Sequence, residues 1–114
     1  MSKPLHYQIV ARARAIIEDG EHWTRDVLAV AKHGTIVEPT DATAERFCAV
    51  GALTRAVAEM TADASNPDAL ASDVHLELLR FVDLPSSATL EAINDSEDGH
   101  AAILALFDDY LSVM

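Results

Sequence analysis

The chain has 114 residues, a length that suits one domain with a buried core and leaves no room for a second domain. Half of the residues are hydrophobic but only 5% are aromatic, and four glycines and four prolines are too few for a fold of many short strands. The formal net charge of −11 disfavours a nucleic-acid-binding protein. We therefore expect one mainly α-helical domain covering residues 1–114.

The excess acidic charge lies in the second half of the sequence. Residues 1–57 hold seven basic and seven acidic side chains, whereas residues 58–114 hold twelve acids and a single base, Arg80. Such an asymmetry suits a surface that binds a basic protein partner, although acidic side chains also keep a small domain soluble.

Targeting and metal-binding signals are missing from the sequence. No run approaches the roughly 18 apolar residues that a membrane-spanning helix needs, and the first ten residues lack the apolar core of a secretory signal. Cys48 is the only cysteine, and the five histidines form no spaced metal motif. We therefore expect a cytoplasmic protein that has no membrane contact, no metal site and no cofactor.

The first expected helix runs from about residue 4 to residue 19, because its apolar side chains recur at helical spacing. The next segment gives conflicting signals. Residues 25–32 suit a short helix followed by an extended arm, which we prefer. Alternatively, residues 28–31 and 35–37 pair across His33 and Gly34. One small β-hairpin near residues 28–38 therefore stays open as an alternative.

Further helices are expected along the rest of the chain. The second spans residues 42–62 and is capped by Thr40 or Asp41. The third starts at the cap signal of Asn66 and Pro67 and reaches residue 82, a short helix follows from residue 86 or 87, and the last covers residues 99–113. The expected fold is mainly α, a compact bundle of four main helices with additional short ones.

A glycine inside the second expected helix needs an explanation, because it costs about 1 kcal/mol relative to alanine. Gly51 shares one helical face with Cys48 and other small side chains. We expect this face to form a shallow groove in which Trp23 or Phe107 packs. Trp23, Gly51 and Phe107 are therefore the candidate structural motif.

Cys48, His100 and either Asn94 or Asp95 are candidate catalytic residues, because they offer a thiol, a base and an orienting group. Structural alternatives exist for the first two. Cys48 lies more than one turn inside the expected helix, where the helix dipole gives a thiolate little help. His100 lies on the inward face of the last helix, where a neutral imidazole would bond to Asn94 or Asp95. The four residues therefore remain candidates without an assigned role.

Several short motifs together resemble a known family. They are Trp23 after the first helix, the run Pro39-Thr40-Asp41, the segment 47–53, the pair Asn94-Asp95, and His100 before the segment 104–108. Over about residues 10–111 the chain is similar to a family of small uncharacterised bacterial and phage helical proteins. That family has no assigned activity, so the resemblance implies only which positions to test first: Trp23, Cys48, Gly51, Asn94, Asp95 and His100.

The sequence leaves the function unknown and three hypotheses open. The first is a small interaction or regulatory module whose acidic C-terminal half contacts a basic protein surface, with a homodimer as another form of association. The second is a thiol-dependent hydrolase or transferase that uses Cys48 and His100. The third is an acidic mimic of nucleic acid. We favour the first, and with it a protein without enzymatic activity.

Overall fold

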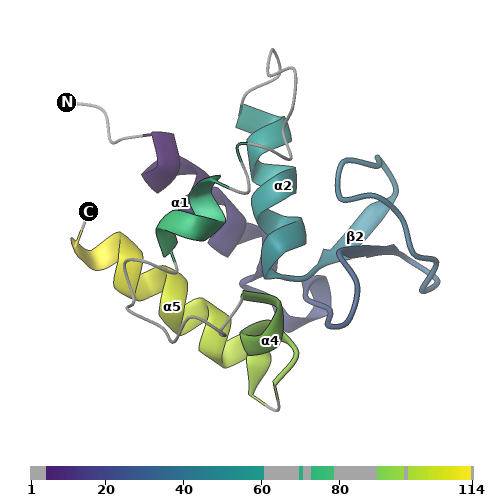
Figure 1. Ribbon diagram of the computed structural model, residues 1–114. Coiled ribbons are helices and arrows are strands. Elements are labelled where there is room, and N and C mark those ends of the chain that lie inside the picture. The colour runs from purple at the N-terminus through teal and green to yellow at the C-terminus, as the bar shows by residue number, and fades with distance from the viewer. Residues whose placement is uncertain (1–4, 61–69, 71–72, 79–89, 97, 114) are drawn as a thin grey trace.

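The computed structural model describes residues 5–60, 70, 73–78, 90–96 and 98–113. Its elements in chain order are α1 (Leu5–Ile17), the short 3₁₀ helix η1 (Gly20–His22), β1 (Ala29–Ala31), β2 (Ala44–Phe47), α2 (Ala49–Met60), α4 (Leu90–Asn94) and α5 (Gly99–Val113) (Figure 1). Residues 73–78 are also helical. The expected mainly helical fold is confirmed. Three of the described helices are long rather than four, and they are accompanied by a two-stranded antiparallel sheet.

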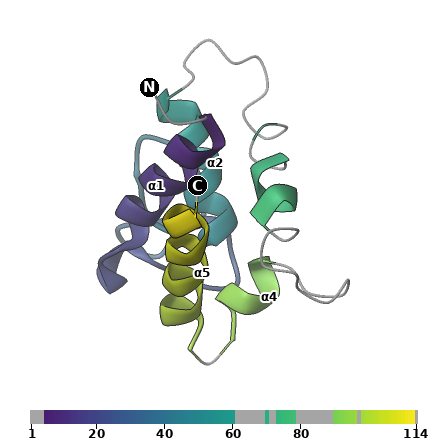
Figure 2. The ribbon, with the colours of Figure 1, turned by 90° about the vertical axis from the view of Figure 1, so that its left-hand side faces the viewer.

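The hydrophobic core lies where the three long helices meet. α1 packs against both α2 and α5, and α4 contacts α5 and α2 (Figures 1 and 2). On α1 and α5 the buried side chains recur every three or four positions and form one stripe, whereas α2 is buried at most positions from Ala49 to Val57. The largest of these fully buried side chains are Ile9, Ile17, Leu53, Val57, Ile103, Phe107 and Tyr110.

The predicted helix boundaries agree best at the two ends of the chain. The last helix was expected over residues 99–113 and has those bounds, and the first helix ends at Ile17 rather than at residue 19. The expected start of the third helix at Asn66 and Pro67, and the expected start at residue 86 or 87, lie outside the described residues. Val74 and Leu78, from the third expected helix, are buried in the core.

The preferred short helix over residues 25–32 is wrong, because residues 25–28 form bends and residues 29–31 form a strand. Ala29 pairs with Phe47 and Val30 with Arg46, so β1 and β2 form the small sheet. The alternative hairpin across His33 and Gly34 is present in short form. Val30 and Ile36 form an antiparallel bridge, the amide of Ala31 donates to the carbonyl of Thr35 at 2.8 Å, and the amide of Val37 donates to the carbonyl of Ala29 at 3.2 Å. Pairing with residues 44–47, which are distant in sequence, decides the conformation of this segment rather than its own helix propensity.

The second helix begins at Ala49, seven residues later than expected. Asp41 caps a turn instead of a helix, because its carboxylate accepts hydrogen bonds from the amide (2.8 Å) and the hydroxyl (2.6 Å) of Thr43. Residues 44–47 then form β2. Their helix-favouring side chains are overridden by the backbone hydrogen bonds that β1 offers.

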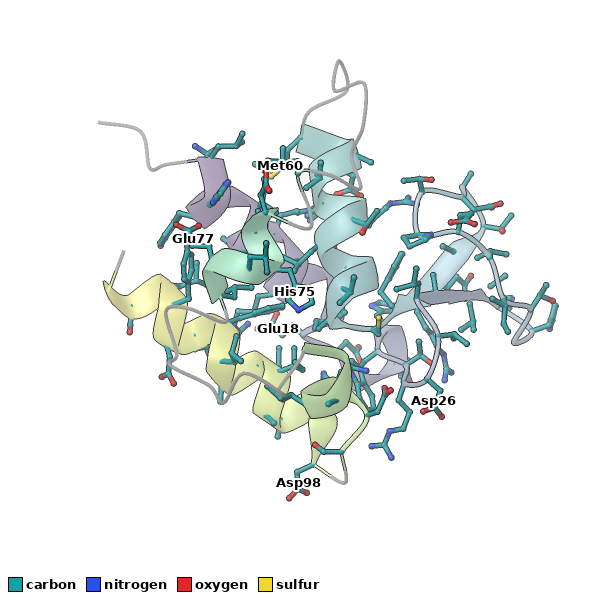
Figure 3. The ribbon with its side chains drawn as sticks, in the orientation of Figure 1. Glu18, Asp26, Met60, His75, Glu77 and Asp98 are labelled. Carbon is teal, nitrogen blue, oxygen red and sulfur yellow. The ribbon has the colours of Figure 1, made fainter. Side chains whose placement is uncertain are left out.

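Tyr110 ties α5 to the helical residues 73–78. Its hydroxyl donates to Glu77 at 3.0 Å, and the same carboxylate is hydrogen-bonded to Nδ1 of His6 on α1. Figure 3 labels Glu77 between α1, which carries His6, and α5, which carries Tyr110. One carboxylate thus connects three helical segments. Among the described residues, no helix is both long and apolar enough to cross a membrane.

Ionisation of Tyr110 is expected to weaken the fold at high pH. Burial, and then the hydrogen bond to Glu77, raise the pKa of Tyr110 to about 12. Because an unfolded tyrosine titrates near about 10, the neutral phenol stabilises the folded state fully below about pH 10, and this stabilisation is lost as the pH rises through about 12. Ultraviolet titration of tyrosinate should show this late ionisation in the wild type and in Tyr7→Phe, but not in Tyr110→Phe. An unchanged titration in Tyr110→Phe would contradict the assignment.

Candidate functional site

The side chain of Asn94 joins three distant parts of the chain. Asn94 ends α4 and is only 1% exposed. Its Oδ1 accepts hydrogen bonds from the indole Nε1 of Trp23 (2.7 Å) and from the backbone amide of Ala49 (3.0 Å). Its Nδ2 donates to the carbonyl of Thr24 and to a carboxylate oxygen of Asp95, each at 3.1 Å. All the hydrogen-bonding atoms of this buried amide therefore have partners.

Cys48 is the N-cap residue of α2, which corrects the expected position inside a helix. Its carbonyl accepts the amide of Ala52 at 2.8 Å, and its Sγ accepts the amide of Gly51 at 3.3 Å. The amides in the first turn of a helix have no partner within the helix. Here the thiol of Cys48 accepts the amide of Gly51, and the side chain of Asn94 accepts the amide of Ala49. The helix begins where these side chains supply acceptors.

Gly51 is required because a backbone segment approaches it closely. A Cβ at this position would lie 2.0 Å from the carbonyl oxygen of Leu28 and 2.9 Å from its carbon. The same oxygen accepts the amide of Cys48 at 3.2 Å. The expected groove for a ring of Trp23 or Phe107 is therefore wrong. The neighbour of Gly51 is main chain from the segment that leads into β1.

His100 bonds to the end of α1 and not to Asn94 or Asp95 as expected. Its Nε2 lies 2.6 Å from the carbonyl oxygen of Ile17. Because a carbonyl only accepts, Nε2 carries the proton and is engaged as a donor. The ring also contacts Trp23, with ring centroids 5.3 Å apart and planes inclined by 41°. His100 thus positions the indole whose Nε1 binds Asn94.

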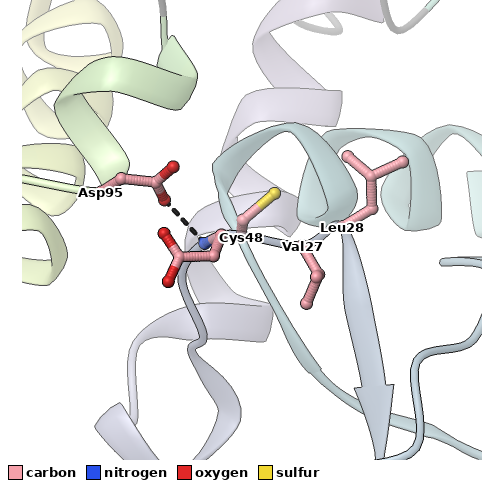
Figure 4. A pocket seen from close by; sticks show the side chains of 5 residues that line it. Val27, Leu28, Cys48 and Asp95 are labelled. Atoms are coloured by element: carbon pink, nitrogen blue, oxygen red, sulfur yellow. Dashed lines mark hydrogen bonds between the residues drawn. The ribbon is translucent and has the colours of Figure 1, made fainter.

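A small pocket opens beside the thiol of Cys48. It has a volume of about 200 Å³ and is lined by Asp26, Val27, Leu28, Cys48 and Asp95 (Figure 4). Asp26 has a left-handed backbone with φ of 73°, and its amide donates to Asp95 at 2.8 Å. Cys48 forms part of the pocket wall although it is only 5% exposed.

The structure separates the four catalytic candidates. Cys48 and Asp95 line the pocket, whereas His100 is not among its lining residues. Asn94 does not line the pocket either, and it belongs to the buried hydrogen-bond network through Ala49 and Asp95. Two carboxylates beside the thiol disfavour a further negative charge there and favour a cationic ligand. Among the described residues, no group of three His, Cys, Asp or Glu side chains is placed to hold a metal ion.

Sequence reasoning missed three of the pocket residues. Asp26, Val27 and Leu28 fell in the segment expected to be helical, and they line the pocket because the chain bends there, just before β1. For Asp26 the only indication in the sequence is the residue type, because aspartate adopts the left-handed backbone region more readily than most residues. Nothing local indicated that its amide would bind Asp95.

The chain matches a protein family whose function is unknown. The model of a family of unknown function, DUF6197, matches residues 1–110. No curated protein and no solved structure matches the chain. The resemblance to a family without an assigned activity is therefore confirmed, and the physical properties of the site have to carry any functional proposal.

Proposed function

The chain belongs to DUF6197, a family of unknown function, and we propose that it is a small interaction module whose acidic surface binds a basic partner protein. The proposal rests on the ion pairs that Arg12 and Arg14 form within the molecule. Arg12 pairs with Glu59 at 2.7 Å, and Arg14 pairs with Asp108 and, at 2.9 Å, with Glu18. These arginines are engaged within the molecule, so they are poorly placed to neutralise the remaining acids.

The pairing also fixes the charge state of the groups involved. The hydrogen bond to Glu59 raises the pKa of Arg12, and the hydrogen bond from Arg12 lowers the pKa of Glu59. Other acids remain at the surface. Asp26 and Asp98 project away from the core (Figure 3), and Asp73 and Asp109 are also exposed. A surface of this kind attracts a basic protein and repels nucleic acid.

The proposal is tested by capturing partners of the full chain from a lysate of the cells that produce it. We expect a basic protein to be retained at about 50 mM salt and released at about 500 mM, because exposed charges are screened over a few ångströms at high ionic strength. The captured protein is then purified, and its affinity is expected to fall at least about tenfold between these salt concentrations. An affinity that does not change with salt, or an acidic partner, would contradict the proposal.

A thiol-dependent hydrolase or transferase using Cys48 is the second candidate, and one observation favours it. The thiol lines a pocket at the start of a helix, where the positive end of the helix dipole favours a thiolate. His100 is a weaker candidate for the base, because its Nε2 is engaged with Ile17 and the pocket offers Asp26 and Asp95 instead.

Alkylation of Cys48 separates the two functions. We expect iodoacetamide to modify the native protein slowly between about pH 6 and 8 and to modify the urea-unfolded protein fast, because the side chain is almost fully buried and faces two carboxylates. Mass spectrometry of the single cysteine gives both rates. Fast native labelling at pH 6 would instead support the enzyme and weaken the interaction module.

A further inference from the structure

We infer that the basic partner docks in a groove around Leu28, and that its docking segment carries an arginine or lysine next to an apolar side chain. This inference rests on the proposed function and names the surface that would perform it. The groove consists of the pocket beside Cys48 and a second pocket, which is also lined by Ile36, Val37, Glu38 and Asp41. Both pockets are lined by Val27 and Leu28, so they form one continuous surface.

The groove has an exposed apolar centre. The side chains of Leu28 and Ile36 are 41% and 68% exposed, and they are among the largest apolar groups that reach the surface. The second pocket has a volume of about 500 Å³ and also contains Val37. Exposed apolar surface that is contiguous and rimmed by polar groups is typical of a protein-binding site.

Carboxylates stand at both ends of this apolar centre. Asp26 and Asp95 flank the first pocket, and Glu38 and Asp41 flank the second. Hydrogen bonds from Thr43 lower the pKa of Asp41, so this carboxylate is charged at neutral pH. Among the described residues, no lysine or arginine lines either pocket. The charge of the groove therefore complements a cationic segment.

Two arginines adjoin residues of the groove without lining it: Arg25 precedes Asp26 in sequence, and Arg55 bonds to Asp41. Arg25 lies over the ring of Trp23, with its guanidinium carbon 5.0 Å from the ring centroid. Arg55 donates to the backbone carbonyls of Pro39 (3.2 Å) and Asp41 (2.8 Å). Neither side chain lines the pockets, so neither occupies the place that a partner's cation would take.

The first pocket suits one long basic side chain. Its volume of about 200 Å³ is that of a single large side chain, with Val27, Leu28 and Cys48 as an apolar wall. Lysine and arginine combine an apolar stem with a cationic head, so the stem would cover this wall while the head lies between Asp26 and Asp95. The larger second pocket then receives a neighbouring apolar side chain of the same segment.

The backbone around the groove is held in place before any partner binds. The carbonyl of Leu28 is fixed against α2 by the amide of Cys48, and the amide of Asp26 is fixed by the carboxylate of Asp95. A site whose shape already exists loses less conformational entropy when it is occupied. The two carboxylates therefore need little rearrangement to receive a cation.

Nuclear magnetic resonance titration of the full ¹⁵N-labelled chain tests the inference. The probe is the peptide acetyl-Ala-Leu-Arg-Leu-Ala-amide, and its control carries citrulline, the neutral isostere, in place of arginine. We expect the amides of Val27, Leu28 and Ile36 to shift, and the citrulline peptide to bind at least about threefold more weakly. Shifts that lie elsewhere, or equal binding of both peptides, would overturn the inference.

Two matched variants test whether the carboxylate of Asp26 in the groove contributes to binding of the arginine peptide. Asp26→Asn keeps a residue that tolerates the left-handed backbone and keeps the amide that donates to Asp95, but it removes one negative charge. Asp109→Asn on α5 removes the same charge from an exposed position that lines neither pocket. We expect Asp26→Asn to weaken arginine-peptide binding about two- to fivefold and Asp109→Asn to leave it nearly unchanged.

The outcomes separate the inference from the proposed function. If both variants weaken binding equally, the acidic surface binds cations without using the groove, so the inference fails and the proposed function survives. If neither the arginine peptide nor decalysine binds at about 50 mM salt, the proposed function fails as well. Protection of the same amides by a concentration-dependent dimer, without peptide, would show that a second copy occupies the groove and would overturn the inference.

Discussion

Replacing Gly51 with alanine is expected to destabilise the protein by about 3 kcal/mol or more. The added Cβ would lie 2.0 Å from the carbonyl oxygen of Leu28. Neither side can yield easily, because Gly51 is in the first turn of α2 and the Leu28 carbonyl is bonded to the amide of Cys48. Urea unfolding followed by circular dichroism measures the loss, which is large beside the 5–15 kcal/mol that is typical of folded domains.

Gly20→Ala provides the matched control for this substitution. A Cβ on Gly20 would approach only the ring of His100, at 3.8 Å, which is an ordinary van der Waals distance. The control should therefore change the free energy of unfolding by less than about 1 kcal/mol. Equal losses for the two variants would mean that close approach of the β1 segment to α2 is not what requires glycine at position 51.

Replacing Asn94 with alanine should have an effect of similar size, a loss of about 3–5 kcal/mol. The substitution removes the acceptor of Trp23 Nε1 and of the Ala49 amide, and it removes the donor to the Thr24 carbonyl. These partners lie around a side chain that is 1% exposed, so water replaces the lost bonds poorly. Urea unfolding gives the loss, and tryptophan fluorescence should report a changed environment of Trp23.

A double-mutant cycle with Trp23→Phe tests the origin of this loss. Phenylalanine keeps a ring next to His100 but removes the N–H that donates to Asn94. The combined variant is expected to lose about 1 kcal/mol less than the sum of the single variants, because each single change already breaks the same hydrogen bond. Additive losses would show that the bond between Trp23 and Asn94 contributes little.

The helices that the sequence predicted well are those that local spacing defines. Ile103, Phe107 and Tyr110 lie four and three positions apart, and all three are buried in the core. This spacing places the three side chains on one face whatever the helix packs against. The bounds of α5 followed from the same local pattern.

The pairing of β1 with β2 was not predictable because β2 is distant in sequence, although the alternative hairpin had placed residues 28–31 in a strand. The prediction of a helix from residue 42 followed from the cap signal of Thr40 or Asp41, and Ala44, Glu45 and Arg46 do not argue against a helix. Only the pairing of Val30 with Arg46 makes the segment extended. Once the helix start moved to Ala49, Cys48 changed from an interior position to an N-cap.

The sequence singled out some residues of the candidate site, but neither their contacts nor the pocket residues Asp26, Val27 and Leu28. Trp23, Asn94 and His100 were identified as positions to test, and the structure links them through the indole ring. The expected bonds from His100 to Asn94 or Asp95 are replaced by a bond to Ile17. Hydrogen bonds from a side chain to the backbone of a distant segment produce no repeating pattern in the sequence, so residue spacing could not predict them.

The amide of Asn94 also bears on how the polypeptide folds during synthesis. Its oxygen completes the first turn of α2 across a separation of 45 residues. A nascent chain that has left the ribosome only as far as α2 lacks this acceptor, and a helix of twelve residues is marginal by itself. The hydrogen bonds at the start of α2 are therefore complete only once α4 has docked, which makes this helix depend on contacts distant in sequence.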